Sequence, residues 1–256
     1  MKRIATIVFC ISLCAAVAWA EDSNKPAFQI ADNTFFDPSR KEVKEEPYSF
    51  RVDYRVEAGY VQHWQRAHSI SFPQMYLHGV QVGATFDFAL PKHFCLQTGL
   101  LYTLVYGRND QHWRSMDAPS VQTEYIRHRV LEHNITIPVR AYYIIPLWKQ
   151  LNMFFFGGPQ LHIGLAETDY IQPHLSGVTQ IWLESQGIPT SKYDRMASKE
   201  LKRANIQLGI GMGFEWDRYR IQGGYDFGLN NQVKMLKVPN QHMWEWGWYV
   251  SFCYRL

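Results

Sequence analysis

The sequence has no apolar run beyond its first 20 residues that approaches the roughly 18 residues of a transmembrane helix. This absence excludes a helical membrane protein once that leader is removed. Cysteine is scarce as well. Two of the four cysteines lie in the leader, and the spacing of the other two, Cys95 and Cys253, gives no reason to predict a disulfide.

Neither positive nor negative charge is in large excess, because the sequence has 26 lysine and arginine residues and 23 aspartate and glutamate residues. Two of the basic residues, Lys2 and Arg3, belong to the leader, so the remaining chain is nearly neutral. A nearly neutral chain lacks the electrostatic footprint of nucleic-acid binding. We therefore expect no nucleic-acid partner.

The leader itself has the form of a secretory signal peptide. A positive start at Lys2 and Arg3 is followed by a short apolar centre and a small-x-small site that ends at Ala20. We expect residues 1–20 to be removed after Ala20 and the protein to reach the outer membrane. Residues 21–47 are charged and punctuated by proline, which predicts a mobile periplasmic N-terminal tail, with a short helix as the alternative.

The most regular pattern lies in residues 243–256. Its apolar column at period two consists of Trp244, Trp246, Trp248, Val250, Phe252, Tyr254 and Leu256. Polar or small residues fill most of the positions between them, so the pattern predicts a β-strand with one apolar and one polar face. A long aromatic strand of this kind is what bacterial outer-membrane β-barrels use to close the barrel.

The same alternation recurs earlier in the chain. It predicts seven further strands at about residues 48–62, 75–90, 93–108, 125–145, 151–167, 203–216 and 219–230. The connections after the second, fourth and sixth strands are tight, and those after the others are long. An even number of antiparallel strands with this alternation of turns is typical of outer-membrane barrels. We predict an all-β fold, an eight-stranded antiparallel transmembrane β-barrel over residues 48–256, with long extracellular loops and short periplasmic turns.

A soluble lipocalin-like barrel, which also has eight strands, is the alternative fold. Two features favour the membrane barrel, in which the apolar face points outward. Full charges occupy the polar face of many strands, as expected of a salt-bridged lumen. Glycines on that face, such as Gly209 and Gly211, suit a narrow interior. Aromatic residues near both ends of the strands also predict two interfacial girdles.

Two stretches resemble a known family. The sequence LEHNITIPVRAYYII at Leu131–Ile145, followed by FFFGGPQLHIG at Phe154–Gly164, is similar to the PorT-like outer-membrane β-barrel family. The resemblance implies a barrel in the outer membrane, and it implies little about activity because these motifs are structural. One member of that family takes part in a secretion and gliding machinery, so a role as a component of a secretion machinery is an alternative function.

Charged residues on the polar face predict an ion-pair network in the lumen. Its expected members in the periplasmic half are Arg51, Asp53, Asp87, Arg140, Glu215, Arg220 and Arg255, with Glu57, Asp226 and Glu245 in the outer half. We expect Arg140 to be held by Asp87 or Asp53, because buried charges persist when they are paired. A proton or ion pathway is the alternative, whereas eight strands leave too little room for a porin channel.

Five histidines are expected in the long loops: His63, His68, His112, His174 and His242. Imidazole binds zinc, copper and haem iron, so capture of a metal or haem by these loops is one hypothesis. No pair has the spacing of ligands on a rigid element, which favours solvated loop side chains instead. The nature of any metal stays open at this stage.

Catalytic signals are weak. The chain has no G-x-S-x-G motif, and Ser176, Ser185, Ser191 and Ser198 merely share the loop 168–202 with His174. We expect a non-enzymatic protein without a cofactor that binds or assembles through its loops or periplasmic face. Its expected partners are outer-membrane lipid and, as a candidate, another envelope protein. A lipid-modifying barrel enzyme is the alternative.

Overall fold

The computed structural model describes residues 51–68, 74–114, 123–148, 150–175, 177–185, 190–234 and 242–256. Their elements are β1 (Val52–His68), β2 (Met75–Ala89), β3 (Phe94–Arg114), β4 (Thr123–Trp148), β5 (Leu151–His174), α2 (Gly177–Ser185), β6 (Tyr193–Asp194), β7 (Ala204–Trp216), β8 (Tyr219–Gly228) and β9 (His242–Arg255). The expected signal peptide and N-terminal tail lie outside these residues.

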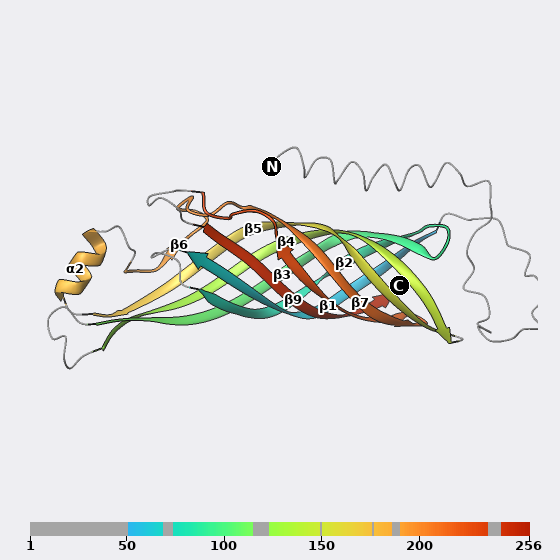
Figure 1. The fold of residues 1–256 in the computed structure, drawn as a ribbon, viewed down its shortest axis with the longest axis horizontal. Helices are drawn as coiled ribbons and strands as arrows, with labels where there is room; N and C mark the ends of the chain where they lie inside the picture. The colour runs from blue at the N-terminus through green and yellow to red at the C-terminus, as the bar shows by residue number, and fades with distance from the viewer. Residues whose placement is uncertain are drawn as a thin grey trace, which may run out of the picture.

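The described strands form a closed antiparallel ring. Successive strands from β1 to β5 pair with one another, β5 pairs with β7, and β9 pairs with both β8 and β1. The two-residue β6 continues the edge of β5 above the point where β7 pairs. Figure 1 shows the ring as one long barrel with α2 beyond one end and the C-terminus toward the other. The predicted eight-stranded antiparallel barrel is confirmed.

Side chains alternate between the lumen and the outside along most of each strand, with an irregularity on β5 between Gly164 and Ala166. On β9, Trp248, Val250 and Phe252 are exposed, whereas Tyr249 and Ser251 are buried in the lumen. The apolar face therefore points outward over the ring, as a lipid-facing barrel requires. The lipocalin-like alternative, in which apolar side chains fill the interior, is wrong.

The short turns follow the predicted pattern. Only Asp217 and Arg218 separate β7 from β8, and Asp217 adopts a left-handed conformation with φ of 52°. Lys92 and His93, in the turn between β2 and β3, have φ of 59° and 68°. Such conformations reverse the chain within a few residues, and they keep these two turns compact.

The long loops are shorter than predicted, because the strands continue past the apolar pattern. β1 extends to His68, β3 to Arg114 and β5 to His174. A β-strand needs about 9–11 residues to cross the hydrocarbon layer, and β3 has 21. Above the lipid the outward residues turn polar, as at Arg108 and Asp110, so the apolar alternation stops while backbone pairing continues.

The lumen also holds an apolar core that the sequence pattern did not predict. Phe154 and Phe156 of β5 and Tyr249 of β9 point inward and belong to one buried cluster. Glycine on the neighbouring strand β7 makes room for these rings, since a Cβ added at Gly211 would lie 2.2 Å from the ring of Phe156. The predicted link between inward glycines and a crowded interior is therefore correct.

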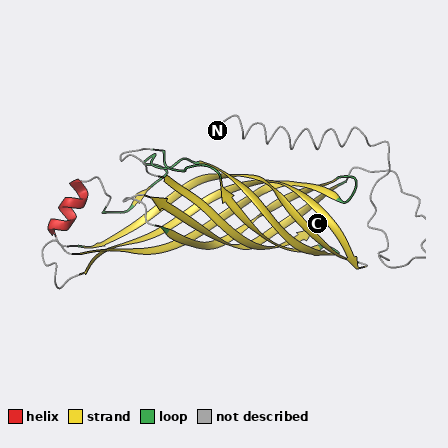
Figure 2. Cartoon of the chain, in the orientation of Figure 1, coloured by secondary structure: helices red, strands yellow, loops and turns green. Residues whose placement is uncertain are grey.

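Helix α2 is a second feature absent from the sequence predictions, which placed residues 168–202 in a loop. Its Leu183 is buried against Ile126 of β4 and Ile171 of β5. Figure 2 shows α2 as a separate element at the end of the strands. No helix among the described residues is long and apolar enough to cross a membrane.

Candidate functional site in the barrel lumen

Four charged side chains form the lowest layer of the lumen. Arg55 Nε lies 2.7 Å from Asp87 Oδ2, and Arg55 Nη2 lies 3.0 Å from Glu215 Oε1. Arg220 Nη2 lies 2.8 Å from Asp87 and 2.7 Å from Glu215 Oε2. All four residues are buried. The two guanidinium groups and the two carboxylates therefore neutralise one another in this layer.

Three of these four residues were predicted as lumen charges, and Arg55 was not assigned to the network. Arg55 lies between Asp53 and Glu57 on the polar face of the same strand, so its alternation could have revealed it. Arg51, Asp53 and Arg255, which were predicted for the same end, lie at the rim. Arg51 pairs with Asp53 at 2.7 Å with an exposed side chain, and Arg255 reaches Asp53 at 3.6 Å.

Arg140 does not meet Asp87 or Asp53, which corrects the sequence prediction. Strand register places Gln97 of β3 opposite both Asp87 and Arg140, and Gln97 donates a hydrogen bond to Asp87 at 2.8 Å. The intervening strand therefore separates the two charges. Arg140 is still buried, and its Nη2 donates to Gln160 Oε1 at 3.1 Å.

Aromatic rings also surround the guanidinium group of Arg140. Its guanidinium carbon lies 5.3 Å from the ring centre of Phe156 and 4.9 Å from that of Tyr249. A cation over an aromatic face is stabilised by the ring quadrupole. Arg140 is thus held by aromatic rings, by an amide and by the longer-range attraction of the carboxylates of Asp226 and Glu57.

Amide side chains continue the packing upward. Gln81 and Gln222 donate to Glu57 Oε1 at 2.9 and 3.3 Å, and the hydroxyl of Tyr142 lies 3.0 Å from Gln222 Oε1. Gln160 donates to Gln207 at 2.8 Å. Described side chains thus fill the lumen through this middle region, which agrees with the limited interior of an eight-stranded barrel.

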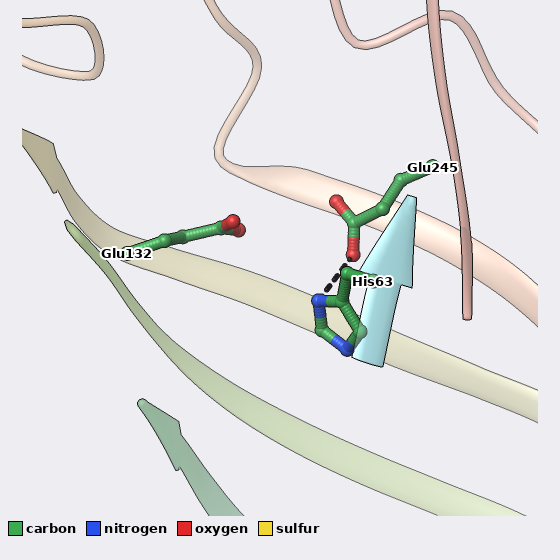
Figure 3. Close-up of side chains that lie close together, drawn as sticks. All are labelled: His63, Glu132 and Glu245. Carbon is green, nitrogen blue, oxygen red and sulfur yellow. Dashed lines mark ion pairs between the residues drawn. The ribbon is translucent and has the colours of Figure 1, made fainter. Parts of the chain in front are cut away.

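The next layer gathers two histidines and two glutamates. His63 of β1 and Glu245 of β9 are side by side, with Nδ1 and Oε1 separated by 3.1 Å, and Glu132 of β4 points toward them from another wall (Figure 3). His162 of β5 lies close as well, with Nδ1 3.8 Å from the same oxygen of Glu245. One donor atom each from His63, Glu132 and Glu245 lies within 4.8 Å of the others.

Amides orient the two carboxylates of this layer. Asn134 donates to Glu132 Oε1 at 2.7 Å, and Gln65 donates to Oε2 at 3.3 Å. Gln232 donates to Glu245 Oε2 at 2.8 Å. All of these residues are almost fully buried. Imidazole nitrogen and carboxylate oxygen together form a donor set suited to a transition metal.

A connecting segment closes the upper end of the lumen. Arg195, which follows β6, is fully buried and reaches Glu167 at 2.9 Å and Asp169 at 2.7 Å, while His128 Nδ1 lies 2.7 Å from Asp169. Burial alone lowers the pKa of the Arg195 guanidinium, but Glu167 and Asp169 outweigh it and raise this pKa above its ordinary value. The arginine therefore stays charged and holds the segment over the lumen.

The predicted loop positions of the histidines are wrong, because all five belong to strands. Only His63 enters the cluster of Figure 3. His68 and His242 are register partners at the upper ends of β1 and β9. His112 and His174 are exposed and flank Tyr125, with ring centres 5.5 and 4.4 Å from it. The longer ladders account for this shift from loop to strand.

The candidate serines do not assemble with His174 either. Ser185 Oγ donates to the backbone oxygen of Trp182, and Ser198 Oγ donates to that of Arg195. Ser191 is exposed, and Ser176 lies outside the described residues. The two hydroxyls are thus committed to the local backbone.

The family follows from a sequence profile that matches residues 43–234, described as the outer membrane protein beta-barrel domain. The chain belongs to this family. Its membership places the protein in the outer membrane, where the outward apolar face of the ring meets lipid. A search of curated proteins finds no matching sequence.

Solved structures with related architecture are distant from this outer-membrane barrel. Ail, the attachment invasion locus protein of Yersinia pestis, solved with the heparin analogue sucrose octasulfate, is 10% identical, with 80% of this chain and 99% of that chain covered and a TM-score of 0.39. Neisserial surface protein A is 11% identical, with 79% and 97% covered and a TM-score of 0.36. Likenesses at this distance carry no argument about function.

Proposed function

We propose that this protein is a non-enzymatic outer-membrane binding protein that acts through the surface of its outer end. The observation that carries the proposal is the packed lumen, in which charged layers, amides and aromatic rings follow one another from Arg55 to Arg195. A barrel filled in this way is a scaffold. Its function then depends on what the scaffold presents to its surroundings.

The presented surface is the outer extension, which we define as residues 108–114 of β3, 123–129 of β4, 169–174 of β5, and α2. These strands project past the others in Figure 1. On the outward face, Asp110 accepts from Arg108 and Arg127 at 2.9 and 3.0 Å. This ion-pair cluster supports a stiff extension that continues the barrel wall beyond the lipid.

Helix α2 carries the most apolar part of the outer extension. Leu183 faces inward, whereas Val178, Ile181 and Trp182 are 56%, 69% and 44% exposed. Exposed apolar groups with an aromatic member are typical of protein-binding surfaces. They support another protein as the partner of this end.

Site-specific photo-crosslinking in intact cells tests the proposal. A photoreactive residue at Ile181 should yield a crosslinked protein adduct, while the same residue at Arg218, in the short turn at the other end, should not. Changing Val178 and Trp182 to serine should weaken the Ile181 adduct without altering the amount of folded barrel. Absence of an adduct at Ile181 contradicts a protein partner at this end.

The opposite pattern would favour the assembly role implied by the PorT-like resemblance. That resemblance rests on Leu131–Ile145 and Phe154–Gly164 and stays a prediction, as does a role in a secretion machinery. An adduct at Arg218 and none at Ile181 supports binding through the periplasmic face. A changed acyl pattern in outer-membrane lipid of a deletion strain, restored by the gene, supports the lipid-modifying enzyme instead.

A further inference from the structure

We propose that the upper lumen is a binding site for one divalent transition-metal ion such as Zn²⁺, with His63, Glu132 and Glu245 as ligands and His162 as the fourth. The four side chains come from β1, β4, β9 and β5, and all are buried. The proposal concerns the lumen and is independent of what the outer extension binds.

The geometry is close to that of a metal centre. Zinc binds histidine nitrogen and carboxylate oxygen at about 2.0–2.2 Å, so its tetrahedral ligand atoms lie about 3.3 Å apart. The donor atoms of His63, Glu132 and Glu245 already lie within 4.8 Å of one another. Rotation of the long glutamate side chains would bring these donor atoms to bonding distance of one ion, and His162, whose Nδ1 lies 3.8 Å from Glu245 Oε1, would approach from β5.

Unsatisfied nitrogen atoms are the second observation. Nδ1 of His63 and Nδ1 of His162 are buried, and neither makes a well-aligned hydrogen bond, although each lies near Glu245 Oε1. The 3.1 Å approach of His63 to Glu245 is close, but it lacks the alignment of a hydrogen bond. A buried polar atom without a partner is destabilising. A metal ion beside Glu245 would satisfy both imidazoles.

Charge distinguishes this layer from those above and below it. In the lowest layer Arg55 and Arg220 neutralise the carboxylates, and at the upper end Arg195 does so. Glu132 and Glu245 are oriented by amides, and their layer contains no arginine or lysine among the described residues; the contact of His63 with Glu245 is an ion pair only when the imidazole is protonated. Amides that fix ligating carboxylates are the usual surroundings of a metal site, and a divalent ion would supply the missing positive charge.

The donor set selects the class of metal. Calcium and magnesium prefer oxygen ligands alone, whereas imidazole together with carboxylate suits zinc and its first-row neighbours. Because the ligands come from strands on different sides of the ring, the ion would connect walls that the backbone ladder does not join. We therefore expect bound metal to stabilise the barrel against unfolding.

The test uses the full chain refolded into detergent with or without ZnCl₂ and then freed of loose metal. Elemental analysis should find about one zinc per chain, and the zinc-loaded barrel should convert to the unfolded band at a higher temperature on a gel. Refolding with Co²⁺ should give the visible absorption of a four-coordinate cobalt centre. Failure of the wild-type chain to retain zinc after refolding with it overturns the proposal.

Variants distinguish a metal site from a cluster in which only protons hold the imidazole and carboxyl groups together. Glu132→Gln should lose the zinc and the zinc-dependent rise in conversion temperature. Glu57→Gln is the matched control, because Glu57 is also a buried lumen carboxylate held by amides, and it should keep both. If Glu132→Gln does not fold, His162→Gln gives the second measurement and should weaken zinc retention. Zinc retained in full by every folded ligand variant contradicts the assignment.

Discussion

Arg55 and Asp87 form a buried ion pair in which Nε and Oδ2 lie 2.7 Å apart, with side chains that are 2% and 5% exposed. Arg220 contacts the same oxygen of Asp87 at 2.8 Å. One carboxylate therefore contacts two guanidinium groups, and Glu215 supplies the second negative charge of the layer. The pair joins β1 to β2, and Arg220 adds β8, so the contact ties together strands that are not all neighbours in the ring.

We predict a large loss of stability for Asp87→Asn, because it leaves two buried guanidinium groups without this partner. Breaking a buried pair typically costs about 3–5 kcal/mol. Asp53→Asn is the control, since Asp53 lies at the rim with a side chain that is 22% exposed, and a surface pair contributes about 0–1 kcal/mol. Urea unfolding in lipid vesicles, followed by tryptophan fluorescence, measures both. Equal losses of stability in the two variants would contradict the burial of the Arg55–Asp87 pair away from water.

Arg140 should respond differently from Arg220. Arg140→Met keeps apolar contact with Phe156 and Tyr249, whereas Arg220→Met leaves the buried carboxylates of Asp87 and Glu215 with one fewer partner. We expect Arg220→Met to cost more than Arg140→Met, because breaking a buried ion pair typically costs about 3–5 kcal/mol, and Arg220 pairs directly with both Asp87 and Glu215. The same urea titrations compare the two variants. A greater loss for Arg140→Met would contradict this order and would show that the attraction of Asp226 and Glu57 dominates at Arg140.

The fold was predictable from the sequence because the lipid imposes a period of two on every spanning strand. Trp244 to Leu256 and the tight turn at Asp217 followed from that rule. The upper strand ends did not, since above the lipid residues such as Arg108 carry no apolar signal although the backbone still pairs. Helix α2 was not predicted for a similar reason, because only Leu183 and Thr179 of its nine residues are buried.

The sequence predicted which side chains point into the lumen, but not which of them contact one another, because alternation shows only the face of the strand on which a residue lies. It placed Arg140, Asp87 and Glu245 in the interior. Which side chains meet depends on register and on contacts across the ring, as when Gln97 separates Arg140 from Asp87. The cluster of His63, Glu132 and Glu245 combines strands β1, β4 and β9, and no short-range spacing in the sequence connects them.

The outer extension offers a pH-dependent prediction at Asp110. Hydrogen bonds from Arg108 and Arg127 hold the pKa of Asp110 below its ordinary value. Because the folded pKa is lowered, the contribution of the pair is present above the unfolded pKa of about 3.9 and is lost as pH falls through the folded value. Carboxyl carbon NMR in nanodiscs should show Asp110 titrating below ordinary aspartates.

Arg127→Gln should raise the pKa of Asp110 toward that of a free aspartate. Arg129→Gln, two residues along the same face of β4, is the control and should change the titration less. An Asp110 that titrates like a solvated aspartate in the wild-type barrel would show that the arginines do not hold it.

The last prediction concerns the glycines that accommodate the aromatic core. A Cβ at Gly211 would lie 2.2 Å from the ring of Phe156 and 2.4 Å from the backbone oxygen of Gly223. Gly211→Ala must therefore displace both a packed ring and a neighbouring strand, and overpacking of this kind typically costs about 1–3 kcal/mol. At Gly157 the nearest atom is the backbone oxygen of Gly209 at 3.5 Å, which is ordinary contact, so Gly157→Ala should be close to neutral. The conversion temperature on a gel and the urea midpoint in vesicles should both fall for Gly211→Ala alone. A loss of similar size at Gly157 would mean that these strands disfavour any side chain, and that the space reserved for Phe156 does not explain the glycine.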